Sequence, residues 1–357
     1  MRILHVITLC ELGGAQTVVC NITNHLCDQH DIMVAVGEGD GKMLDELSPK
    51  IKIKRIPDLV RRISPLKEIK TLFALKKIYR NFKPDIIHLH SSKAGILGRI
   101  AFPPKKIVYT VHGFDSIRIA YRKYLPLERF LQNRCASIVG VSKYDEHNLK
   151  FERIHNNVTT IHNGIAKTKP LTNNPFEKLG ENYKGTVLCI ARLAPPKNHK
   201  LFLKIAQHLP EYRFVWIGNL EEPSFPYPSN VYFLGNLPNA AAYTKYADLF
   251  LLPTNYEGLP LVVIEALSNG TPVVASAVGG IPEILDGTNG IAVNNDRKFM
   301  TKAVKRFLNA TVEEKKQRSI AAMKSYEKEF TVDKMVNGYL NIYNRIVTQN
   351  ENRHSRR

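Results

Sequence analysis

Residues Tyr256-Glu257-Gly258-Leu259-Pro260-Leu261-Val262-Val263-Ile264-Glu265-Ala266-Leu267 form the stretch that decides the fold of this chain. The stretch follows the apolar run 248–254, which has the length and composition of a buried strand. Pro260 then stands where a helix is expected to begin, because the missing N–H of proline would have no partner at the first helical position. Gly270 and Pro272 end that helix. The pattern therefore predicts a strand, a loop and a helix in succession.

Two carboxylates occupy this unit, Glu257 in the predicted loop and Glu265 on the second turn of the predicted helix. The backbone N–H groups of Gly258 and Leu259 and the helix dipole favour a phosphate at the start of the helix. Because carboxylates repel phosphate, two of them here point to a ligand that also carries hydroxyl groups. Both could instead be solvated surface charges, but Glu265 lies among apolar residues, and a charged group is rarely buried without a partner.

Glu257 and Glu265 are separated by seven residues, and the run Gly279-Gly280-Ile281-Pro282-Glu283 follows them. This arrangement resembles the E-x7-E signature of the retaining glycosyltransferases of family 4. The resemblance implies an α/β fold of the GT-B type, in which two Rossmann-like domains face each other across a cleft.

The composition is that of a globular chain with a large positive charge. Its 357 residues allow two domains, and 44% hydrophobic and 23% charged residues are ordinary values. No apolar run approaches the ~20 residues of a membrane-spanning helix, and no signal peptide is recognised. Five cysteines without a C-x-x-C spacing are expected to be reduced and buried. The net charge of +19 fits an anionic membrane surface better than nucleic acid, because no nucleic-acid-binding motif is present.

Strand and helix patterns alternate along the chain, which predicts mostly parallel sheets covered by helices on both faces. In the first half we expect strands at 3–8, 32–36, 51–56, 85–90, 107–112, 137–142 and 158–162, with helices that include 15–28, 65–82, 121–136 and 143–153. In the second half we expect strands at 214–218, 231–234, 249–253, 272–276 and 290–293, with helices at 199–209, 239–247, 261–268, 281–285 and 296–309.

The domain boundaries follow from this alternation and from one polar stretch that contains proline. We expect an N-terminal, acceptor-side domain at 1–166, a linker at 167–184 and a C-terminal, nucleotide-sugar-binding domain at 185–330. The resemblance implies a further helix at 331–349 that crosses back to the first domain. The tail 350–357 is expected to be disordered.

Gly13 and Gly14 stand between the first predicted strand and the first predicted helix. Their spacing is not the G-x-G-x-x-G of dinucleotide-binding domains, which argues against an NAD-dependent enzyme. They could form a tight turn and nothing else, or they could let the loop pass close to a ligand. Family 4 enzymes carry a similar loop that faces the acceptor and the donor phosphate, so the resemblance implies a donor-binding role.

His112 closes an apolar strand, at the end where open α/β sheets bind ligands. A lone histidine is more often structural, but Thr110-Val111-His112-Gly113 resembles the family motif whose histidine lies near the donor sugar. His88 and His90 alternate with apolar residues in another strand. Their spacing would suit a metal ion, but the sequence shows no third ligand, and we interpret them as strand residues.

Arg192 and Lys197 lie in the loop Arg192-Leu193-Ala194-Pro195-Pro196-Lys197-Asn198, which follows another predicted strand. Two cations at one end of a sheet can clamp a diphosphate, although exposed basic residues are also common in a basic protein. The loop resembles the R-L-x-x-x-K-N/G loop with which the family binds the leaving diphosphate.

The resemblance implies transfer of a glycosyl group from a nucleotide sugar, with a UDP-sugar as the commonest donor. Arg192 and Lys197 would then stabilise the leaving diphosphate. The other expected roles are sugar binding by Glu257 and His112, ribose binding by Glu265, and completion of the donor site by Gly13, Gly14, Gly258, Leu259 and Pro260. No D-x-D motif stands in a suitable loop, so we expect neither metal ion nor cofactor. Since no carboxylate is obviously placed as a nucleophile, retention is expected to proceed by front-face transfer.

Two predicted helical regions of the first domain mix basic with apolar residues. One carries Arg61, Arg62, Lys67, Lys70, Lys76, Lys77 and Arg80, and the other Arg118, Arg122, Lys123 and Arg129. Such regions suit docking on anionic lipid at about 1 kcal/mol per cation, with solvated helix faces as the alternative. Docking would favour a lipid-linked or oligosaccharide acceptor, as in capsule, O-antigen or exopolysaccharide assembly. It would place the protein in the cytoplasm, peripheral on the inner face of the membrane.

Two other functions are compatible with parts of this pattern. A nucleotide-sugar 2-epimerase shares the fold and the diphosphate cleft but needs no acceptor, and the combination of the Arg192–Lys197 loop with E-x7-E argues against it. A non-catalytic protein that binds a nucleotide sugar or nucleic acid would show affinity without turnover.

Overall fold

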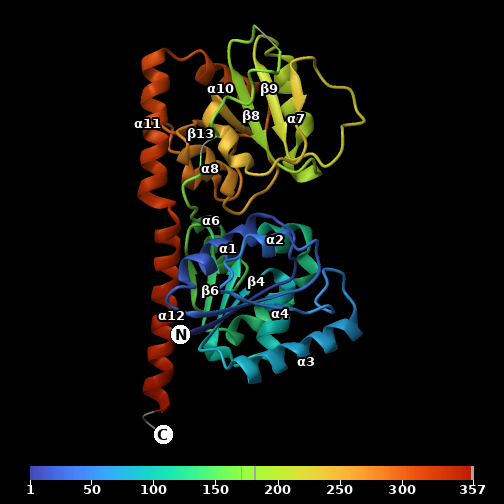
Figure 1. The fold of residues 1–357 in the computed structure, drawn as a ribbon, viewed down its shortest axis with the longest axis vertical. Helices are drawn as coiled ribbons and strands as arrows, with labels where there is room; N and C mark the ends of the chain where they lie inside the picture. Colours follow the sequence, from blue (N-terminus) through green and yellow to red (C-terminus); the bar gives the residue numbers. More distant parts are fainter. Residues whose placement is uncertain (170, 181, 355–357) are drawn as a thin grey trace. The chain divides into compact units, whose positions relative to one another are not determined.

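The computed structural model describes residues 1–169, 171–180 and 182–354, and the chain divides into two compact units (Figure 1). The first unit contains Met1–Gly164 together with the last helix, and the second contains Ile165–Thr331. Each unit is a parallel sheet covered by helices, so the predicted α/β fold class is confirmed.

The first unit is built on a seven-stranded sheet in the order β3-β2-β1-β4-β5-β6-β7. Its strands are β1 Arg2–Ile7, β2 Asp31–Val36, β3 Lys52–Arg55, β4 Ile86–His90, β5 Ile107–Val111, β6 Ser137–Gly140 and β7 Val158–Thr160. All neighbouring strands pair in parallel. The central strands β4 and β5 are buried along their whole length, because helices cover both faces of a parallel sheet.

Seven α-helices belong to the described part of this unit: α1 Gly14–Leu26, α2 Lys42–Asp45, α3 Pro65–Phe82, α4 Ser92–Ala101, α5 Leu125–Leu131, α6 Lys143–Phe151 and α12 Val332–His354. Helix α4 covers one face of the sheet, where Gly95 and Gly98 abut Tyr109 and Leu89. Helix α12 lies against the opposite face, where Tyr343 contacts His88.

The second unit is built on a six-stranded sheet in the order β10-β9-β8-β11-β12-β13, again parallel throughout. Its strands are β8 Thr186–Ile190, β9 Arg213–Ile217, β10 Val231–Phe233, β11 Leu249–Leu252, β12 Val273–Ser276 and β13 Gly290–Val293. Its helices are α7 His199–Gln207, α8 Leu261–Ser268, α9 Ile281–Ile284, α10 Arg297–Leu308 and α11 Val312–Glu329, together with the short 3-10 helices η5 Pro195–Lys197 and η6 Ala240–Tyr246.

The predicted strands agree with these bounds to within two residues, which is the usual uncertainty at element ends. Helices α2, α4 and α11 were not among the predicted ones. The run 121–136, predicted as one helix, consists of the 3-10 turns η3 Arg122–Tyr124 and η4 Gln132–Arg134 on either side of α5, and a π-helical turn, η2 Ser116–Ala120, precedes them. Pro126 explains the break, because it cannot donate to a helix that extends back to residue 121.

Helix α8 has the predicted bounds, but Pro260 is its N-cap and not its first helical residue. Two predicted boundaries differ from the structure. The prediction of a disordered tail from residue 350 is wrong as far as His354, where α12 ends, and residues 355–357 lie outside the described part. The stretch 167–184, expected to be a linker, is part of the second unit, and its Phe176 is fully buried there. None of the described helices is long and apolar enough to span a bilayer.

Candidate active site

The strand order of each sheet reverses at one point, between β1 and β4 in the first unit and between β8 and β11 in the second. Open α/β sheets bind ligands outside the carboxyl ends of their strands at such a reversal. Arg192 and Lys197 follow β8, and Glu257 follows β11. The residues predicted to bind the donor diphosphate and its sugar therefore gather at the reversal point of the second sheet.

Lys197 and Glu257 contact each other directly, with 2.5 Å between Lys197 Nζ and Glu257 Oε1. Their loops leave the sheet side by side because β8 pairs with β11. Both side chains are mostly buried, at 22% and 11% exposed. A charge-assisted hydrogen bond in such a place is stronger than one in open solvent. Two residues that the sequence assigned to different parts of the ligand thus form one ion pair.

The loop that carries Lys197 is fixed to the loop that carries Glu257 through the carbonyl of Pro196. That carbonyl accepts hydrogen bonds from the backbone N–H of Asn255 at 2.7 Å and from Thr254 Oγ1 at 3.0 Å. The two prolines of the sequence motif therefore help to define the position of the lysine, and they do not displace it from the site.

The turn at Gly279 and Gly280 supports the backbone of Glu257 from another side. Gly280 N donates to Gly258 O at 2.7 Å. Gly279 has φ +57°, and a Cβ atom at this position would lie 2.0 Å from Glu257 O. Only glycine fits there without displacing Glu257, which gives the glycine pair of the sequence motif a physical reason.

Arg192 is exposed at the same sheet end. Among the residues that the structure describes, no carboxylate lies within ion-pair distance of its guanidinium. Lys197 is ion-paired with Glu257 through one of its three N–H donors and keeps the others for a further anion, whereas Arg192 has no carboxylate partner among the described residues.

Glu265 lies on the second turn of α8, one turn beyond the loop of Glu257. Burial raises the pKa of its carboxyl group to about 7. In the described part of the chain no cation pairs with this carboxylate. A ligand that offers hydroxyl groups would satisfy it, since a carboxylate only accepts hydrogen bonds. Leu259 and Pro260 are buried between the two glutamates and connect the loop to the helix.

Gly13 and Gly14 lie at the start of α1, after β1 of the first unit. Gly13 is extended at φ −173°, and neither glycine has a positive φ. A Cβ atom on Gly14 would meet nothing within 4 Å. The backbone therefore does not require glycine for a tight turn, and the open space at Gly14 favours the alternative of a close approach by a ligand.

His112 directly follows β5 and belongs to a chain of histidines. His112 Nε2 lies 3.0 Å from His90 Nδ1, and His90 Nε2 lies 3.1 Å from His5 Nδ1. Burial lowers the pKa of His5 to about 3 and that of His112 to about 4. His90 is fully buried as well, and burial followed by the neighbouring histidines lowers its pKa well below the usual value. All three imidazoles are neutral near pH 7.

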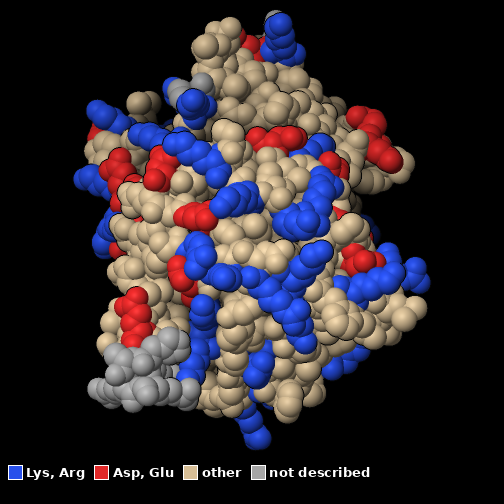
Figure 2. All heavy atoms as spheres, turned by 60° about the horizontal axis from the view of Figure 1, so that its bottom comes forward, with Lys and Arg blue, Asp and Glu red and all other residues tan. Residues whose placement is uncertain are grey.

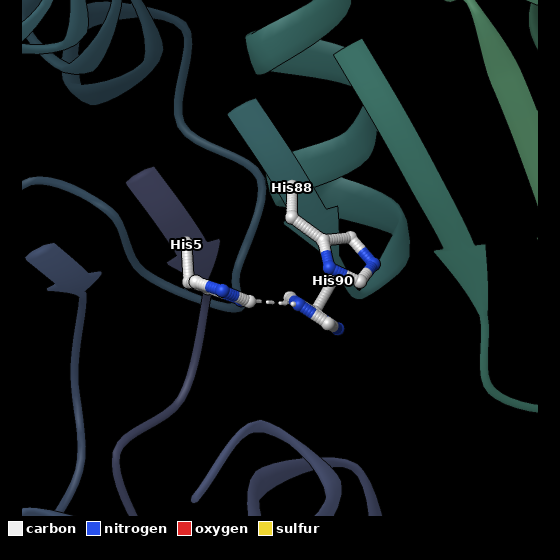
Figure 3. Close-up of side chains that lie close together, drawn as sticks. All are labelled: His5, His88 and His90. Carbon is white, nitrogen blue, oxygen red and sulfur yellow. Dashed lines mark hydrogen bonds between the residues drawn. The ribbon is translucent and has the colours of Figure 1, made fainter. Parts of the chain in front are cut away.

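His5 is the third histidine that the sequence did not reveal beside His88 and His90 (Figure 3). Ligand nitrogens of the three rings lie within 4.8 Å of one another. However, both nitrogens of His88 already bond hydroxyl groups, Tyr343 at 2.6 Å and Thr110 at 2.7 Å. The arrangement fits a hydrogen-bonded network between the sheet and α12 better than a set of ligands held ready for a metal ion.

Sequence reasoning also missed the support of the loop after His112. Phe114 N donates to Asp145 Oδ1 at 2.7 Å, and Ser142 Oγ donates to Asp145 Oδ2 at 2.9 Å. Asp145 is fully buried on α6. The sequence shows only an aspartate near the start of a predicted helix, and its partner Phe114, in the loop after β5, lies 31 residues away in the sequence.

Comparison with known proteins covers both units. A family model described as "Glycosyltransferase Family 4" matches residues 12–169, and one described as "Glycosyl transferases group 1" matches residues 184–310. The chain is 28% identical to the UDP-Gal:alpha-D-GlcNAc-diphosphoundecaprenol alpha-1,3-galactosyltransferase of Escherichia coli over 78% of this chain and 80% of that protein. It is 26% identical to the capsular polysaccharide biosynthesis glycosyltransferase CapM of Staphylococcus aureus over 77% of this chain and 80% of that protein.

The fold is also found among solved structures. Sucrose-phosphate synthase from Thermosynechococcus elongatus superimposes with a TM-score of 0.85 and 18% sequence identity, over 98% of this chain and 99% of that one. The two family models follow each other in the order of the two units, and the motifs of the second unit lie at its reversal point. The chain therefore belongs to the GT-B glycosyltransferases of family 4.

Proposed function

We propose that this protein is a retaining, metal-independent glycosyltransferase. It moves a hexosyl or N-acetylhexosaminyl group from a UDP-sugar to a lipid-linked saccharide during the assembly of a cell-surface polysaccharide such as a capsule. The observation that carries the proposal is the Lys197–Glu257 ion pair at the reversal point of the second sheet, at the same sheet end as Arg192, which has no carboxylate partner among the described residues. This group combines a site for negative charge with a site for hydroxyl groups.

The donor diphosphate binds at Arg192 and Lys197. Arg192 offers a planar fork of N–H donors that matches phosphate oxygens, and Lys197 adds a point charge. Because Lys197 is held by Glu257, it is in position before the donor arrives and needs little reorganisation when charge develops. Such preorganised electrostatic stabilisation of the leaving group is usually the largest contribution to catalysis. The two cations perform the task that a metal ion performs in other transferases.

Glu257 accepts hydrogen bonds from hydroxyl groups of the donor sugar, and Glu265 accepts them from the ribose. The spacing of the glutamates supports these separate roles, since one lies in the loop and the other on the second turn of α8. His112, neutral and at the end of β5, contacts the sugar.

Transfer proceeds on the front face of the sugar. The bond from the anomeric carbon to the diphosphate oxygen breaks, and a bond from that carbon to the acceptor oxygen forms on the same face. The acceptor proton passes to the departing diphosphate oxygen. The configuration at the anomeric carbon is retained without a covalent enzyme intermediate.

The acceptor and the donor base are inferred from the relatives. The Escherichia coli relative is named for a UDP-galactose donor and a diphosphoundecaprenol-linked acceptor, and the Staphylococcus aureus relative for capsular polysaccharide. A lipid-linked acceptor requires access to a membrane surface, and helix α3 supplies a candidate for that contact.

Helix α3 exposes apolar side chains in one stripe. Leu66 is 76%, Ile69 52% and Phe73 70% exposed, and their spacing places them on one face of the helix. Lys70 and Lys77 continue the same face. Figure 2 brings this side of the first unit forward and shows Lys and Arg side chains over much of it. The mixture suits an interfacial position on anionic lipid.

The second basic region contributes less than its sequence implied. Arg118 pairs with Asp115 at 2.8 Å, and Arg122 and Arg129 both pair with Glu152 at 2.8 Å. These intramolecular pairs hold the three arginines in place, and the two carboxylates offset two of their three positive charges. We therefore assign membrane contact to α3 and not to the region around α5.

Transfer itself is tested with radiolabelled UDP-glucose, UDP-galactose and UDP-N-acetylglucosamine and a lipid extract from cells that assemble a capsule. We expect label from one donor in the chloroform-soluble fraction, unchanged by EDTA, lost in Arg192→Gln, and in a product whose anomeric proton coupling shows retention. An inverted product contradicts the front-face mechanism, and loss of transfer in EDTA contradicts metal independence. Conversion of the donor into an epimeric nucleotide sugar, with no label in the lipid fraction, would favour an epimerase.

A further inference from the structure

The histidine chain of the first unit joins three neighbouring strands. His5 lies on β1, His90 on β4 and His112 just after β5. The register aligns His5 with His88 and His90 with Thr110, so the period of two places the three side chains on one face of the sheet. Figure 3 shows the ring of His5 directed toward that of His90.

Only two arrangements of the protons on the ring nitrogens of His5, His90 and His112 satisfy both contacts between the rings. Three neutral imidazoles carry three N–H groups, and each of the two contacts between rings uses one. If His90 carries its proton on Nδ1, it donates to His112 Nε2 and accepts from His5 Nδ1, so the third N–H is His112 Nδ1. If His90 carries its proton on Nε2, both contacts reverse and the third N–H is His5 Nε2. The three rings thus always share the same tautomer.

The surroundings of the two ends differ. His5 is 0% exposed, and its Nε2 has no hydrogen-bond partner. His112 Nδ1 is likewise buried and without a partner, but His112 as a residue is only half-buried and lies at the strand end where water or a ligand can supply an acceptor, whereas His5 is out of reach. A buried N–H without an acceptor is rarer in proteins than an under-used acceptor. The arrangement that leaves His5 Nε2 without a proton is therefore favoured.

We propose that His5 and His90 are positioning residues that fix the proton of His112 on Nδ1, so that His112 donates a hydrogen bond to a hydroxyl or phosphate oxygen of the bound donor. The use of this hydrogen bond rests on the proposed function. The tautomer itself is a property of the histidine chain and can be observed without any substrate.

The ends of β1 and β4 are held in a way that supports a dedicated geometry. Ser91, next to His90, has φ 68° and ψ 151°, a backbone conformation that residues other than glycine rarely adopt. Its Oγ lies 2.7 Å from Thr8 Oγ1 and accepts from Thr8 N at 3.3 Å. A strained residue tied to the neighbouring strand keeps the two strand ends, and the histidines on them, in register.

The test is a two-bond nitrogen–proton correlation spectrum of protein labelled with 15N-histidine, at pH 7 and without substrate. We expect His5, His90 and His112 all as the Nδ1–H tautomer. Mixed tautomers, a shared Nε2–H tautomer or a charged imidazolium at any of the three would overturn the proposal. The measurement is made on the wild-type protein, and single histidine variants are needed only to assign the signals.

Two substitutions at the far end test the coupling. His5→Leu leaves His90 Nε2 facing an apolar group, which still disfavours a proton there, so His112 should keep Nδ1–H. His5→Asn offers an amide that can donate or accept equally, so His112 should become a mixture of tautomers. With half of the molecules in the donating form, the KM for the donor sugar should rise about twofold with kcat unchanged. If both variants behave alike in the spectrum, the coupling is contradicted.

Failure of this proposal can be distinguished from failure of the proposed function. If all three histidines show the Nδ1–H tautomer but no nucleotide sugar is turned over, the tautomer proposal holds and the proposed function fails. If sugar is transferred but the tautomers of the three histidines are not linked, the proposed function holds and the tautomer proposal fails.

Discussion

Lys197 Nζ donates a hydrogen bond to Glu257 Oε1 at 2.5 Å, although 60 residues separate the two in the sequence. The pair joins the two loops that follow the central strands of the second sheet. It also implies that stability and activity depend on these residues in different ways, because each side chain stabilises the other before any ligand binds.

Lys197→Met should lower both stability and activity. It leaves the mostly buried carboxylate of Glu257 unpaired, which we expect to cost about 1–3 kcal/mol in the free energy of unfolding. The rate of nucleoside diphosphate release should fall by about 10²–10³. Urea unfolding and a coupled release assay measure the two quantities.

The double variant Lys197→Met/Glu257→Gln is the matched control. Removing the second charge should restore most of the lost stability, whereas release should stay as low as in the single variant. If activity recovered together with stability, Lys197 would have a structural role only.

Glu265 should make donor binding depend on pH. Its pKa is raised to about 7 by burial, and only the ionised carboxylate can accept hydrogen bonds from both ribose hydroxyls. Ligand binding then favours the ionised form, so nucleotide affinity should be constant above pH 7 and fall by up to about tenfold per pH unit below it. Calorimetric titrations with UDP between pH 5.5 and 8.5 measure this.

The stability of the fold should depend on pH in the opposite direction to nucleotide affinity. A raised pKa means that the folded state prefers the protonated carboxyl group of Glu265. The free energy of unfolding should therefore fall as the pH rises from the ordinary pKa of a glutamate to the raised pKa of about 7. Glu265→Gln should abolish the pH dependence of UDP affinity and increase stability at pH 8. Unchanged pH dependence in the variant would show that another group is responsible.

Gly279→Ala should displace Glu257. The new Cβ would lie 2.0 Å from Glu257 O, at φ +57°. We expect a loss of about 2 kcal/mol or more and a large fall in release. Gly287→Ala is the control, because Gly287 has φ +92° but a Cβ there meets nothing within 4 Å. Equal losses of activity in the two variants would mean that backbone strain alone, and not contact with Glu257, is responsible.

Helix α3 should carry membrane binding. Phe73→Ser removes a 70% exposed aromatic ring from the apolar stripe, and we expect at least tenfold weaker sedimentation with vesicles of phosphatidylglycerol and phosphatidylcholine. Phe299→Ser on α10, which removes a 57% exposed ring, is the control and should bind like the wild type. Binding should weaken with added salt, and salt-independent binding would contradict an electrostatic surface.

Much of this architecture was predictable because the relevant signals are local. The alternation of strands and helices, the loop of Arg192 and the spacing of Glu257 and Glu265 are each contained in a short run of sequence. The resemblance to family 4 rests on the same runs, and both family models confirm it.

The remaining features depend on which strands become neighbours. The His5–His90 contact requires β1 beside β4, and the Lys197–Glu257 contact requires β8 beside β11. Pairing of this kind is not encoded in local periodicity. The ion pairs of the arginines near α5 were missed for the same reason, since Arg122 finds its partner Glu152 30 residues away. The prediction of one helix over 121–136 was wrong for a local reason, because Pro126 was present in the sequence and breaks that helix.

The measurement that tests the central claim most directly is release of nucleoside diphosphate from UDP-, GDP-, ADP- and dTDP-sugars by the wild type and by Glu257→Ala. The account predicts slow hydrolysis of one UDP-sugar by the wild type. The variant should lose this hydrolysis but still bind UDP. Nucleotide binding without any release, with or without membrane lipid as acceptor, would contradict it and leave a protein that binds a nucleotide sugar without transferring it.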